Sequence, residues 1–249
     1  MAKIGIFDSG SGGLSVYREI VKLLPQEQYM YFADNAHCPY GEKSPVYIQR
    51  RARFITEHFL DAGADIIVVA CNTATAAAIA VLRQEYPDVP FVGMEPAVKP
   101  AALGTVTGVI GVLATAGTLK GSKYLKTRGL YESDVKIVEH VGQGFVELVE
   151  SGILDGPQAE DTVRASLQPL LDAGADRIVL GCTHYPFLKP VIERLSGPSV
   201  QVIDPAPAVA RQTLRILQER EVPTGVGPFS VKLEASGDME PLTRIFSLI

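Results

Sequence analysis

Short apolar runs alternate with longer amphipathic stretches along the chain. The run at residues 66–70 (Ile-Ile-Val-Val-Ala) is apolar at every position, which is typical of a strand covered by helices on both faces. Residues 13–24 instead repeat apolar side chains every three or four positions, as an amphipathic helix does. The same criteria predict strands at residues 4–7, 29–33, 66–70, 91–94, 108–114, 135–140 and 177–180, and helices at residues 13–24, 45–62, 73–85, 119–129, 156–173 and 187–195.

Strands that recur with helices between them predict βαβ units, parallel sheets and therefore an α/β protein. Residues 100–119 carry no charge over about the length of a membrane-spanning helix. They hold four glycines and four threonines, so we predict a turn, the strand at 108–114 and a second turn there. No membrane association is expected.

An internal repeat links the two halves of the chain. Residues 60–73 recur at residues 171–184 with nine identities among fourteen positions, at a constant offset of 111. A common helix-to-strand turn would explain the repeated glycine, but not a cysteine directly after the strand in both copies, Cys71 and Cys182. We therefore predict two similar α/β lobes, each a mainly parallel sheet flanked by helices. We expect pseudo-twofold symmetry with the active site between the lobes.

Composition and charge exclude several classes of protein. The 249 residues are 47% hydrophobic and 20% charged, unlike a disordered chain. Lys and Arg number 23 against 28 Asp and Glu, and no dense basic cluster occurs, so nucleic acid is not an expected partner. Three cysteines without framework spacing argue against a secreted disulfide scaffold. The first residues turn polar at once, which is unlike a signal peptide and predicts a cytoplasmic protein.

Four segments lie where an open parallel sheet binds ligands, beyond the carboxyl ends of its strands. They are residues 8–13, 71–73, 115–118 and 182–184. Each lies between a strand and a helix and offers backbone N–H groups at the start of that helix, which favours anions such as carboxylates. If the lobes face each other, the two repeated cysteines reach one ligand from opposite sides.

The cysteines have alternative interpretations. A lone buried cysteine is more often a small apolar residue than a reagent, and we interpret Cys38 in this way. The position of Cys71 and Cys182 after a strand, beside hydroxyl and amide side chains, favours a function instead. A zinc site is disfavoured because no Cys-x-x-Cys or paired histidine spacing is present. A redox dithiol and a carboxylate-binding module without turnover stay open.

Other polar residues accompany these segments. The glycine-rich residues 8–13 lack the Gly-Lys-Ser/Thr of a P-loop and the third glycine of a dinucleotide fingerprint, so we expect them to let backbone approach a ligand closely. Asp8 is interpreted equally well as a helix cap. His184 is expected to polarise the thiol of Cys182 or relay its proton. Residues 39–41 (Pro-Tyr-Gly) indicate a structural turn, and Glu150 is interpreted by default as a solvated helix charge.

Two thiols on opposite faces of a ligand suit one reaction, in which a proton leaves one face of a carbon and is replaced on the other. An ordinary thiol, with a pKa of about 8.5, is a few per cent ionised near neutrality, and lowering that pKa by about 1.5 requires roughly 2 kcal/mol. A helix N-terminus or a charge-assisted hydrogen bond supplies about that amount. Two close thiolates repel, so the pair naturally shares one proton. These residues suffice for cofactor-free proton abstraction next to a carboxylate.

The chain also resembles the glutamate racemases of the cofactor-independent aspartate/glutamate racemase superfamily. The most specific matches are Cys71-Asn-Thr-Ala and Gly181-Cys-Thr-His-Tyr-Pro. Further matching segments, in family order, are residues 6–14, 31–34, 39–41, 115–118 and 148–150. The matches extend from Ile4 to about Asp204 and so cover most of the chain.

The resemblance implies interconversion of L- and D-glutamate without a metal or cofactor, which supplies D-glutamate for peptidoglycan synthesis in a bacterial cytoplasm. It implies that Cys71 and Cys182 are the two acid/base residues, with Cys71 acting on the D-isomer and Cys182 on the L-isomer. Asp8, His184 and Glu150 would assist the thiols. The substrate-binding residues implied are Asp8, Ser9, Pro39, Tyr40, Gly41, Asn72, Thr73, Thr115, Thr118, Thr183 and His184.

The resemblance further implies a discontinuous first lobe, residues 1–97 plus 206–249, and a second lobe at residues 98–205. The break at residues 204–207 (Asp-Pro-Ala-Pro), followed by a helix at residues 208–220 and a strand near residues 229–234, fits this division. Glutamate would be the small-molecule partner, and homodimers are common in the family. Relatives in the superfamily that act on aspartate, a hydantoin or a malonate are the alternative for the substrate.

Overall fold

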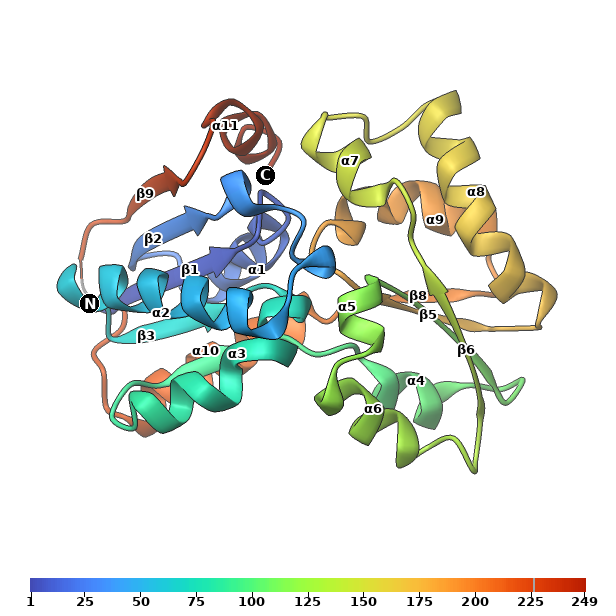
Figure 1. Cartoon of the computed structure of the whole chain (residues 1–249), viewed down its shortest axis with the longest axis horizontal. Coiled ribbons are helices and arrows are strands. Elements are labelled where there is room, and N and C mark those ends of the chain that lie inside the picture. Colours follow the sequence, from blue (N-terminus) through green and yellow to red (C-terminus); the bar gives the residue numbers. More distant parts are fainter. Residues whose placement is uncertain (226) are drawn as a thin grey trace.

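The computed structural model describes residues 1–225 and 227–249 and contains two parallel β-sheets, one in each half of the molecule (Figure 1). The first sheet has the strand order β4-β3-β1-β2-β9 and consists of β1 (Lys3–Asp8), β2 (Gln28–Ala33), β3 (Ile66–Val69), β4 (Phe91–Gly93) and β9 (Ser230–Ala235). The second has the order β6-β5-β7-β8 and consists of β5 (Val109–Ala114), β6 (Lys136–Val141), β7 (Arg177–Gly181) and β8 (Gln201–Ile203). The predicted α/β class with two parallel sheets is confirmed.

Helices surround each sheet, and we call the two halves the first and second lobes (Figure 1). Around the first sheet lie α1 (Leu14–Leu23), α2 (Pro45–Asp61), α3 (Asn72–Glu85), α10 (Ala206–Glu219) and α11 (Glu240–Phe246). Around the second lie α4 (Val98–Gly104), α5 (Ala116–Leu119), α6 (Ser122–Gly129), α7 (Phe145–Glu150), α8 (Pro157–Asp172) and α9 (Lys189–Ser196). Short 3₁₀ helices form at η1 (Asn35–His37), η2 (Tyr40–Glu42) and η3 (Tyr185–Leu188). The C-terminal elements return to the first lobe, beside the N-terminal strands.

Helices cover the two faces of the first sheet, which explains why its strands are apolar throughout. Along β1, Ile4 and Ile6 belong to the core that includes residues of α1 and α10. Phe7 points to the other face and belongs to the core formed with α2 and α3. Successive strand residues point to opposite faces, so a strand between two helix layers needs apolar side chains at every position.

The internal repeat corresponds to equivalent strands of the two sheets. The order β4-β3-β1-β2 of the first sheet matches β8-β7-β5-β6 of the second, so the repeated segments contain β3 and β7 at matching places. Each repeated aspartate also accepts a backbone N–H at or before the start of the neighbouring strand, since Asp65 Oδ2 accepts that of Lys3 in β1 and Asp176 Oδ2 accepts that of Val106, which precedes β5, each at 2.7 Å. The repeat therefore preserves a strand, its anchoring carboxylate and the cysteine that follows.

Local differences from the predictions have physical causes. Residues 98–104 form α4 where a turn was predicted, because Val98 and Ala101 are buried in the core of the second lobe. The single helix predicted at 119–129 is two helices, α5 and α6, which meet at Gly121. A Cβ at Gly121 would lie 2.7 Å from Ala76 Cβ, so the chain turns there against the first lobe.

Two further boundaries differ. The helix predicted at 187–195 begins at Lys189 as α9 and follows the 3₁₀ turn η3. Pro190 lies in the first turn of α9, where backbone N–H groups have no partner within the helix, so the missing N–H of proline costs no hydrogen bond. Strand β8 was not predicted, because its three residues are too few to show a periodicity.

Candidate active site

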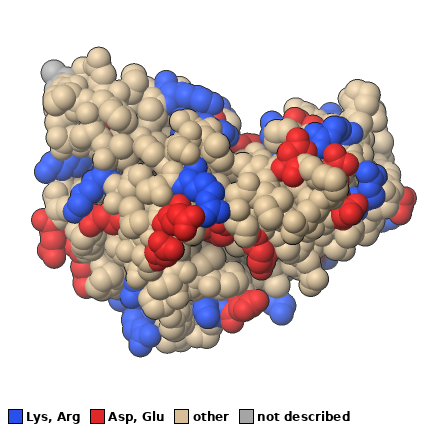
Figure 2. Space-filling view, turned by 90° about the horizontal axis from the view of Figure 1, so that it is seen from above, with Lys and Arg blue, Asp and Glu red and all other residues tan. Residues whose placement is uncertain are grey.

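A narrow cavity lies between the lobes, next to the carboxyl ends of β1, β3, β5 and β7. Its walls are Ser9, Cys38, Pro39, Tyr40, Gly41, Cys71, Asn72, Thr73, Thr115, Val146, Cys182, Thr183 and His184. Both repeated cysteines are in its wall, one from each lobe. The surface seen in Figure 2 is hollowed between the two halves, and its acidic and basic side chains are interspersed.

Cys71 is placed by the junction of β3 and α3. It is the N-cap of α3, and the backbone N–H of Ala74 donates to its Sγ at 3.4 Å. The thiol in turn contacts Ser9 Oγ at 3.8 Å. Burial raises the pKa of the Cys71 thiol well above its ordinary value, and the nearby carboxylate of Asp8 raises it further. Both effects favour the protonated form of the Cys71 thiol.

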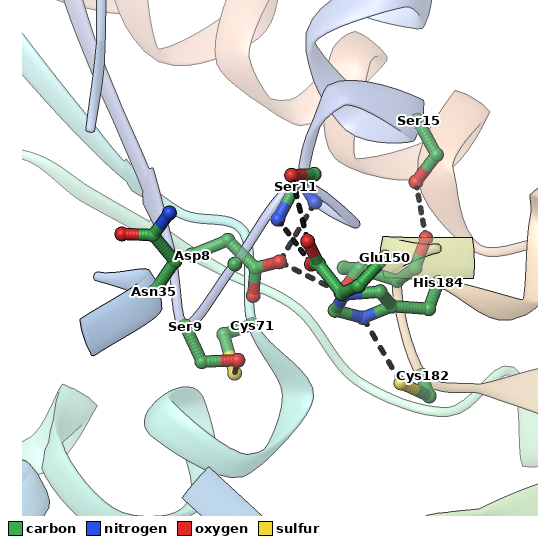
Figure 3. Close-up of polar contacts among 12 residues, drawn as sticks. Asp8, Ser9, Ser11, Ser15, Asn35, Cys71, Glu150, Cys182 and His184 are labelled. Atoms are coloured by element: carbon green, nitrogen blue, oxygen red, sulfur yellow. Dashed lines mark hydrogen bonds and ion pairs between the residues drawn. The ribbon is translucent and has the colours of Figure 1, made fainter. Parts of the chain in front are cut away.

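Cys182 has a different environment, because a chain of polar groups leads away from it (Figure 3). Its Sγ lies 3.7 Å from Nδ1 of His184, and Nε2 of His184 donates to Glu150 Oε1 at 2.7 Å. Glu150 is held by Ser11, whose N–H donates to Oε1 at 2.7 Å and whose hydroxyl donates to Oε2 at 3.0 Å. The default interpretation of Glu150 as a solvated charge is wrong, since it anchors this chain.

The charged states of His184 and Glu150 stabilise each other. Burial opposes a charge on His184, but its contacts with Cys182 and Glu150 outweigh burial and raise the pKa of the imidazole well above its ordinary value. Burial likewise opposes ionisation of Glu150, but His184 and the two Ser11 donors lower its pKa below the ordinary value. The protonated imidazole places a positive charge 3.7 Å from the sulfur of Cys182. The Cys182 side of the cavity therefore carries a cation that is itself held by a carboxylate.

The glycine-rich loop has a purpose other than the predicted one. A Cβ at Gly10 would lie 2.3 Å from Glu150 Oε1, and a Cβ at Gly12 would lie 2.3 Å from His184 Nδ1. Neither glycine lines the cavity. The expectation that this loop brings backbone close to a ligand is therefore wrong for these two positions: their missing side chains make room for the His184–Glu150 pair.

Asp8 joins the two lobes beneath the cavity. Its Oδ2 accepts the N–H of Gly13 at 2.8 Å and the hydroxyl of Thr183, from the second lobe, at 3.2 Å. Within the part of the chain that the structure describes, its buried Oδ1 has no hydrogen-bond partner. Burial raises the pKa of the Asp8 carboxyl above its ordinary value, although His184 opposes this. Asp8 therefore holds Gly13, the residue before α1, without making a side-chain cap bond to the helix itself, and it lies behind the cavity wall.

Threonine hydroxyls from both lobes meet at one side of the cavity. Thr73 Oγ1 lies 2.9 Å from Thr115 Oγ1, which lies 3.0 Å from Thr118 Oγ1. Next to them, Asn72 is 3% exposed, and neither polar atom of its side chain has a hydrogen-bond partner among residues 1–225 and 227–249. Buried amides are almost always paired, so Asn72 is poised to bind a polar ligand group.

The Pro39–Tyr40–Gly41 segment forms another wall of the cavity. The Tyr40 hydroxyl donates to Asp34 Oδ2 at 2.5 Å, so only its ring and backbone remain for a ligand. Cys38, interpreted as a small buried residue, is in fact partly exposed and also lines the cavity. Burial raises the pKa of the Cys38 thiol to about 12, which keeps it protonated.

The predicted residues divide into those that line the cavity and those behind it. Asp8, Thr118 and Glu150 are not in the described wall, whereas the other predicted site residues are. Sequence reasoning missed Ser11, which holds Glu150, and Ser15, whose hydroxyl donates to the Thr183 carbonyl at 2.9 Å. Their partners lie more than a hundred residues away in the chain, so no local pattern could reveal them.

Two kinds of feature are absent from residues 1–225 and 227–249. No group of three or more His, Cys, Asp or Glu side chains is arranged to hold a metal ion. No helix in these ranges is both long and apolar enough to cross a membrane.

Known proteins resemble the chain over its whole length. The pattern of the Asp/Glu/Hydantoin racemase family matches residues 4–213. The glutamate racemase of Ectopseudomonas mendocina is 49% identical over 248 residues, which cover 100% of this chain and 94% of that protein. The glutamate racemase of Pseudomonas putida strain W619 is 52% identical over 221 residues, which cover 89% of this chain and 83% of that protein.

Solved structures agree with these sequence matches. The structure of a glutamate racemase isoform from Bacillus anthracis matches with a TM-score of 0.89 and 32% identity, covering 99% of this chain and 93% of that one. Escherichia coli glutamate racemase, solved with L-glutamate and the activator UDP-MurNAc-ala, matches with a TM-score of 0.88 and 34% identity, covering 99% and 94%.

Proposed function

Because the chain belongs to the Asp/Glu/Hydantoin racemase family and is an amino-acid racemase, we propose that it interconverts L- and D-glutamate by proton transfer between two cysteines. The relatives named glutamate racemase, at about half identity over the full chain, support the substrate. The observation that carries the mechanism is the pair of thiols, Cys71 and Cys182, which line one cavity from two lobes at equivalent strand ends. No cofactor takes part in the proposed reaction.

The reaction transfers one proton at each face of the substrate Cα. In the L-to-D direction the Cys182 thiolate takes the Cα proton, and the electron pair of the broken C–H bond moves into the adjacent carboxyl group. The Cys71 thiol then donates its proton to the opposite face of Cα, and a new C–H bond forms there. The protein is left with a thiol at Cys182 and a thiolate at Cys71, which is the state required for the D-to-L direction.

Neighbouring residues prepare these protonation states. His184, held by Glu150, stabilises the thiolate at Cys182. On the other side, Ser9 contacts the Cys71 thiol, and the Ala74 N–H at the start of α3 stabilises the thiolate that forms there in the reverse direction. Asp8 links these parts through Thr183.

The cavity walls provide groups for both carboxylates and the amino group of glutamate. We propose that Asn72, whose side chain lacks a partner in the described structure, binds the substrate directly. The remaining substrate-binding residues proposed in the wall are Ser9, Pro39, Tyr40, Gly41, Thr73, Thr115, Thr183 and His184. Asp8 and Thr118 act from behind it.

The wider setting follows from the same proposal. D-glutamate formed in the cytoplasm would supply peptidoglycan synthesis. The lobe boundaries at residues 97/98 and 205/206 agree with the division of strands between the two sheets. Association as a homodimer stays a prediction.

Proton NMR in D₂O, combined with polarimetry, tests the function. L-glutamate is incubated with the purified protein without added pyridoxal phosphate. We expect the Cα proton signal to disappear and the optical rotation to decay to zero. Loss of the Cα proton signal of aspartate but not of glutamate would support the proposed chemistry and contradict the proposed substrate. Loss of neither signal would overturn the proposed function.

A further inference from the structure

A buried ion pair stands behind one wall of the cavity. Tyr40 is 1% exposed, and its hydroxyl donates to Asp34 Oδ2 instead of pointing to a ligand. The Asp34 side chain is fully buried at the end of β2 and accepts two hydrogen bonds from Arg51 of α2. These run from Nε to Oδ2 at 2.9 Å and from Nη2 to Oδ1 at 2.7 Å.

The carboxylate at the centre depends on its partners. Burial opposes ionisation of Asp34, but the hydrogen bonds from Arg51 and Tyr40 outweigh it and lower the pKa of Asp34 below its ordinary value. His37 is a further neighbour, with Nε2 4.0 Å from Oδ1. The Arg51 guanidinium also stacks 4.7 Å from the ring centre of Phe54, which fixes its direction.

The segment between Asp34 and Gly41 is held at both ends. The N–H of Ala36 donates to Ser236 Oγ at 3.1 Å, and the N–H of Gly237 donates to Asn35 Oδ1 at 2.8 Å, so the C-terminal part of the first lobe holds its beginning. At its end, Gly41 packs against Gly117 of the second lobe, where a Cβ would lie 3.2 Å from Gly41 Cα. Tyr40 and its bond to Asp34 are therefore the central support of this wall.

We propose that Arg51 is a positioning residue for substrate binding: acting through Asp34 and Tyr40, it fixes the Pro39–Gly41 wall in the shape that binds glutamate. The inference rests on the proposed function. Arg51 does not line the cavity, so it has no direct contact to offer the substrate. Its effect reaches the cavity only through the buried carboxylate and the tyrosine hydroxyl.

Helix α2 offers a matched control. Arg53 lies two residues further along the helix and makes the same kind of two-bond contact with Glu85, from Nε to Oε2 at 2.6 Å and from Nη2 to Oε1 at 2.8 Å. Both partners of that pair are at the surface, away from the cavity. Arg53→Ala removes an equivalent ion pair from the same helix, so a difference between the variants reports the coupling to the wall.

The experiment compares steady-state kinetics of Arg51→Ala and Arg53→Ala in both reaction directions. We expect Arg51→Ala to raise KM about tenfold and to lower kcat less than about threefold, because the wall binds substrate and transition state alike. Arg53→Ala should leave both parameters within about twofold of the original protein. Arg51→Lys keeps the positive charge but cannot make both hydrogen bonds to Asp34, so its KM should lie between those of the original protein and Arg51→Ala. The lysine variant replaces Arg51→Ala in the comparison if the alanine variant folds poorly.

Two further readouts separate this inference from the function itself. If Arg51 acts through Tyr40, Arg51→Ala should add little to KM in a Tyr40→Phe background, as a double-mutant cycle measures. Hydrogen exchange of the amides at residues 38–43 needs no substrate and should accelerate in Arg51→Ala but not in Arg53→Ala. If the protein is active but Arg51→Ala and Arg53→Ala have equal KM values, the inference about Arg51 is overturned and the proposed function is not. Additive effects of Arg51→Ala and Tyr40→Phe on KM would have the same consequence. If the unsubstituted protein is inactive, the proposed function is overturned. Hydrogen exchange at residues 38–43 would then still test whether Arg51 supports the wall.

Discussion

The two thiols occupy equivalent positions in two similar lobes, yet their surroundings differ. Cys71 contacts one hydroxyl and one backbone N–H, and burial holds it as a thiol. Cys182 lies beside an imidazole that is charged through Glu150. The duplicated strand-to-helix junction thus supplies two sulfurs, whereas the charge that distinguishes them comes from His184, which stands where the first copy of the repeat has Thr73, and from Glu150 outside the repeat.

This difference has a chemical consequence. A reaction that takes a proton on one face and returns one on the other needs a base and an acid at the start, and two identical thiol sites sharing one proton would not fix which sulfur is the base. The His184–Glu150 pair on one side removes that ambiguity. Because the pair lies on the Cys182 side, changes to the two half-sites should alter kcat and KM unequally in the two reaction directions, while kcat/KM falls equally in both because the two enantiomers have the same free energy.

The largest effect should follow loss of either sulfur. Cys71→Ala and Cys182→Ala are each expected to reduce racemisation by at least about 1,000-fold, because general acid–base catalysis contributes up to about 10⁴-fold. In D₂O, Cys71→Ala should still exchange the Cα proton of L-glutamate faster than that of D-glutamate, and Cys182→Ala should show the reverse. Measurement of exchange by NMR for each enantiomer checks this, and equal exchange of both enantiomers would contradict the assignment of faces.

Loss of the imidazole should have the next largest effect. His184→Asn removes the cation beside Cys182, and we expect kcat in the L-to-D direction to fall about 100-fold and its rise with pH to move to higher pH. The kcat of the D-to-L direction should show the smaller change in its pH profile, because Cys71 is the base in that direction. Initial rates at saturating substrate from about pH 6 to about pH 10 in both directions provide the test. Identical displacement of the two profiles would show that His184 does not distinguish the half-sites.

Loss of the partner carboxylate should also change the pH dependence of stability. The pKa of His184 is raised in the folded protein and that of Glu150 is lowered, so their pair stabilises fully above the ordinary glutamate value of 4.5 and below the ordinary histidine value of 6.5. This stability is lost as pH rises through the raised pKa of His184 or falls through the lowered pKa of Glu150. Glu150→Gln should therefore cost about 2 kcal/mol near pH 5.5 and less at high pH. Denaturant unfolding at several pH values measures this, and a pH-independent difference would contradict it.

A methyl group placed against the same pair should have a moderate effect. Gly12→Ala would push against His184 and is expected to cost about 1–3 kcal/mol in stability and to lower the L-to-D rate about tenfold. Gly129→Ala, at the end of α6 with no atom within 4 Å of the new Cβ, is the matched control and should leave activity unchanged. Comparable losses of activity in both variants would refute the explanation of the glycine-rich loop.

The smallest effect should come from the shared scaffold. Asp65→Asn and Asp176→Asn each weaken one anchor of the repeat and should cost about 1 kcal/mol, without favouring either reaction direction. Thermal unfolding and the ratio of rates in the two directions check this pair. A change in that ratio would mean that the scaffold, and not only the surroundings of the thiols, distinguishes the half-sites.

The strands and most of the long helices could be predicted because their signal is local. An apolar run such as residues 66–70 is visible in any window, and the repeat placed Cys71 and Cys182 at equivalent strand ends. The short helix α4 and the three-residue strand β8 gave no such signal, because they are held by burial against other elements.

The chemistry of the site was less accessible from the sequence. Glu150 looks like a surface charge until Ser11, 139 residues away, donates two hydrogen bonds to it. The glycines at 10 and 12 resemble a ligand-binding loop, and only the folded chain shows that they make room for side chains of the other lobe. The pairing of Arg51 with Asp34 likewise depends on the way α2 packs beside β2.

Isotope partitioning in a single turnover tests the two-thiol mechanism most directly. The protein in D₂O, in excess over L-glutamate, is quenched early, and the Cα hydrogen of both enantiomers is analysed by mass spectrometry after chiral separation. Cys71 has exchanged with solvent before the substrate binds, so the first D-glutamate should carry deuterium while the remaining L-glutamate keeps protium. D-glutamate that retains the original protium would show that a single base removes and returns the proton, and would contradict the division of labour between Cys71 and Cys182.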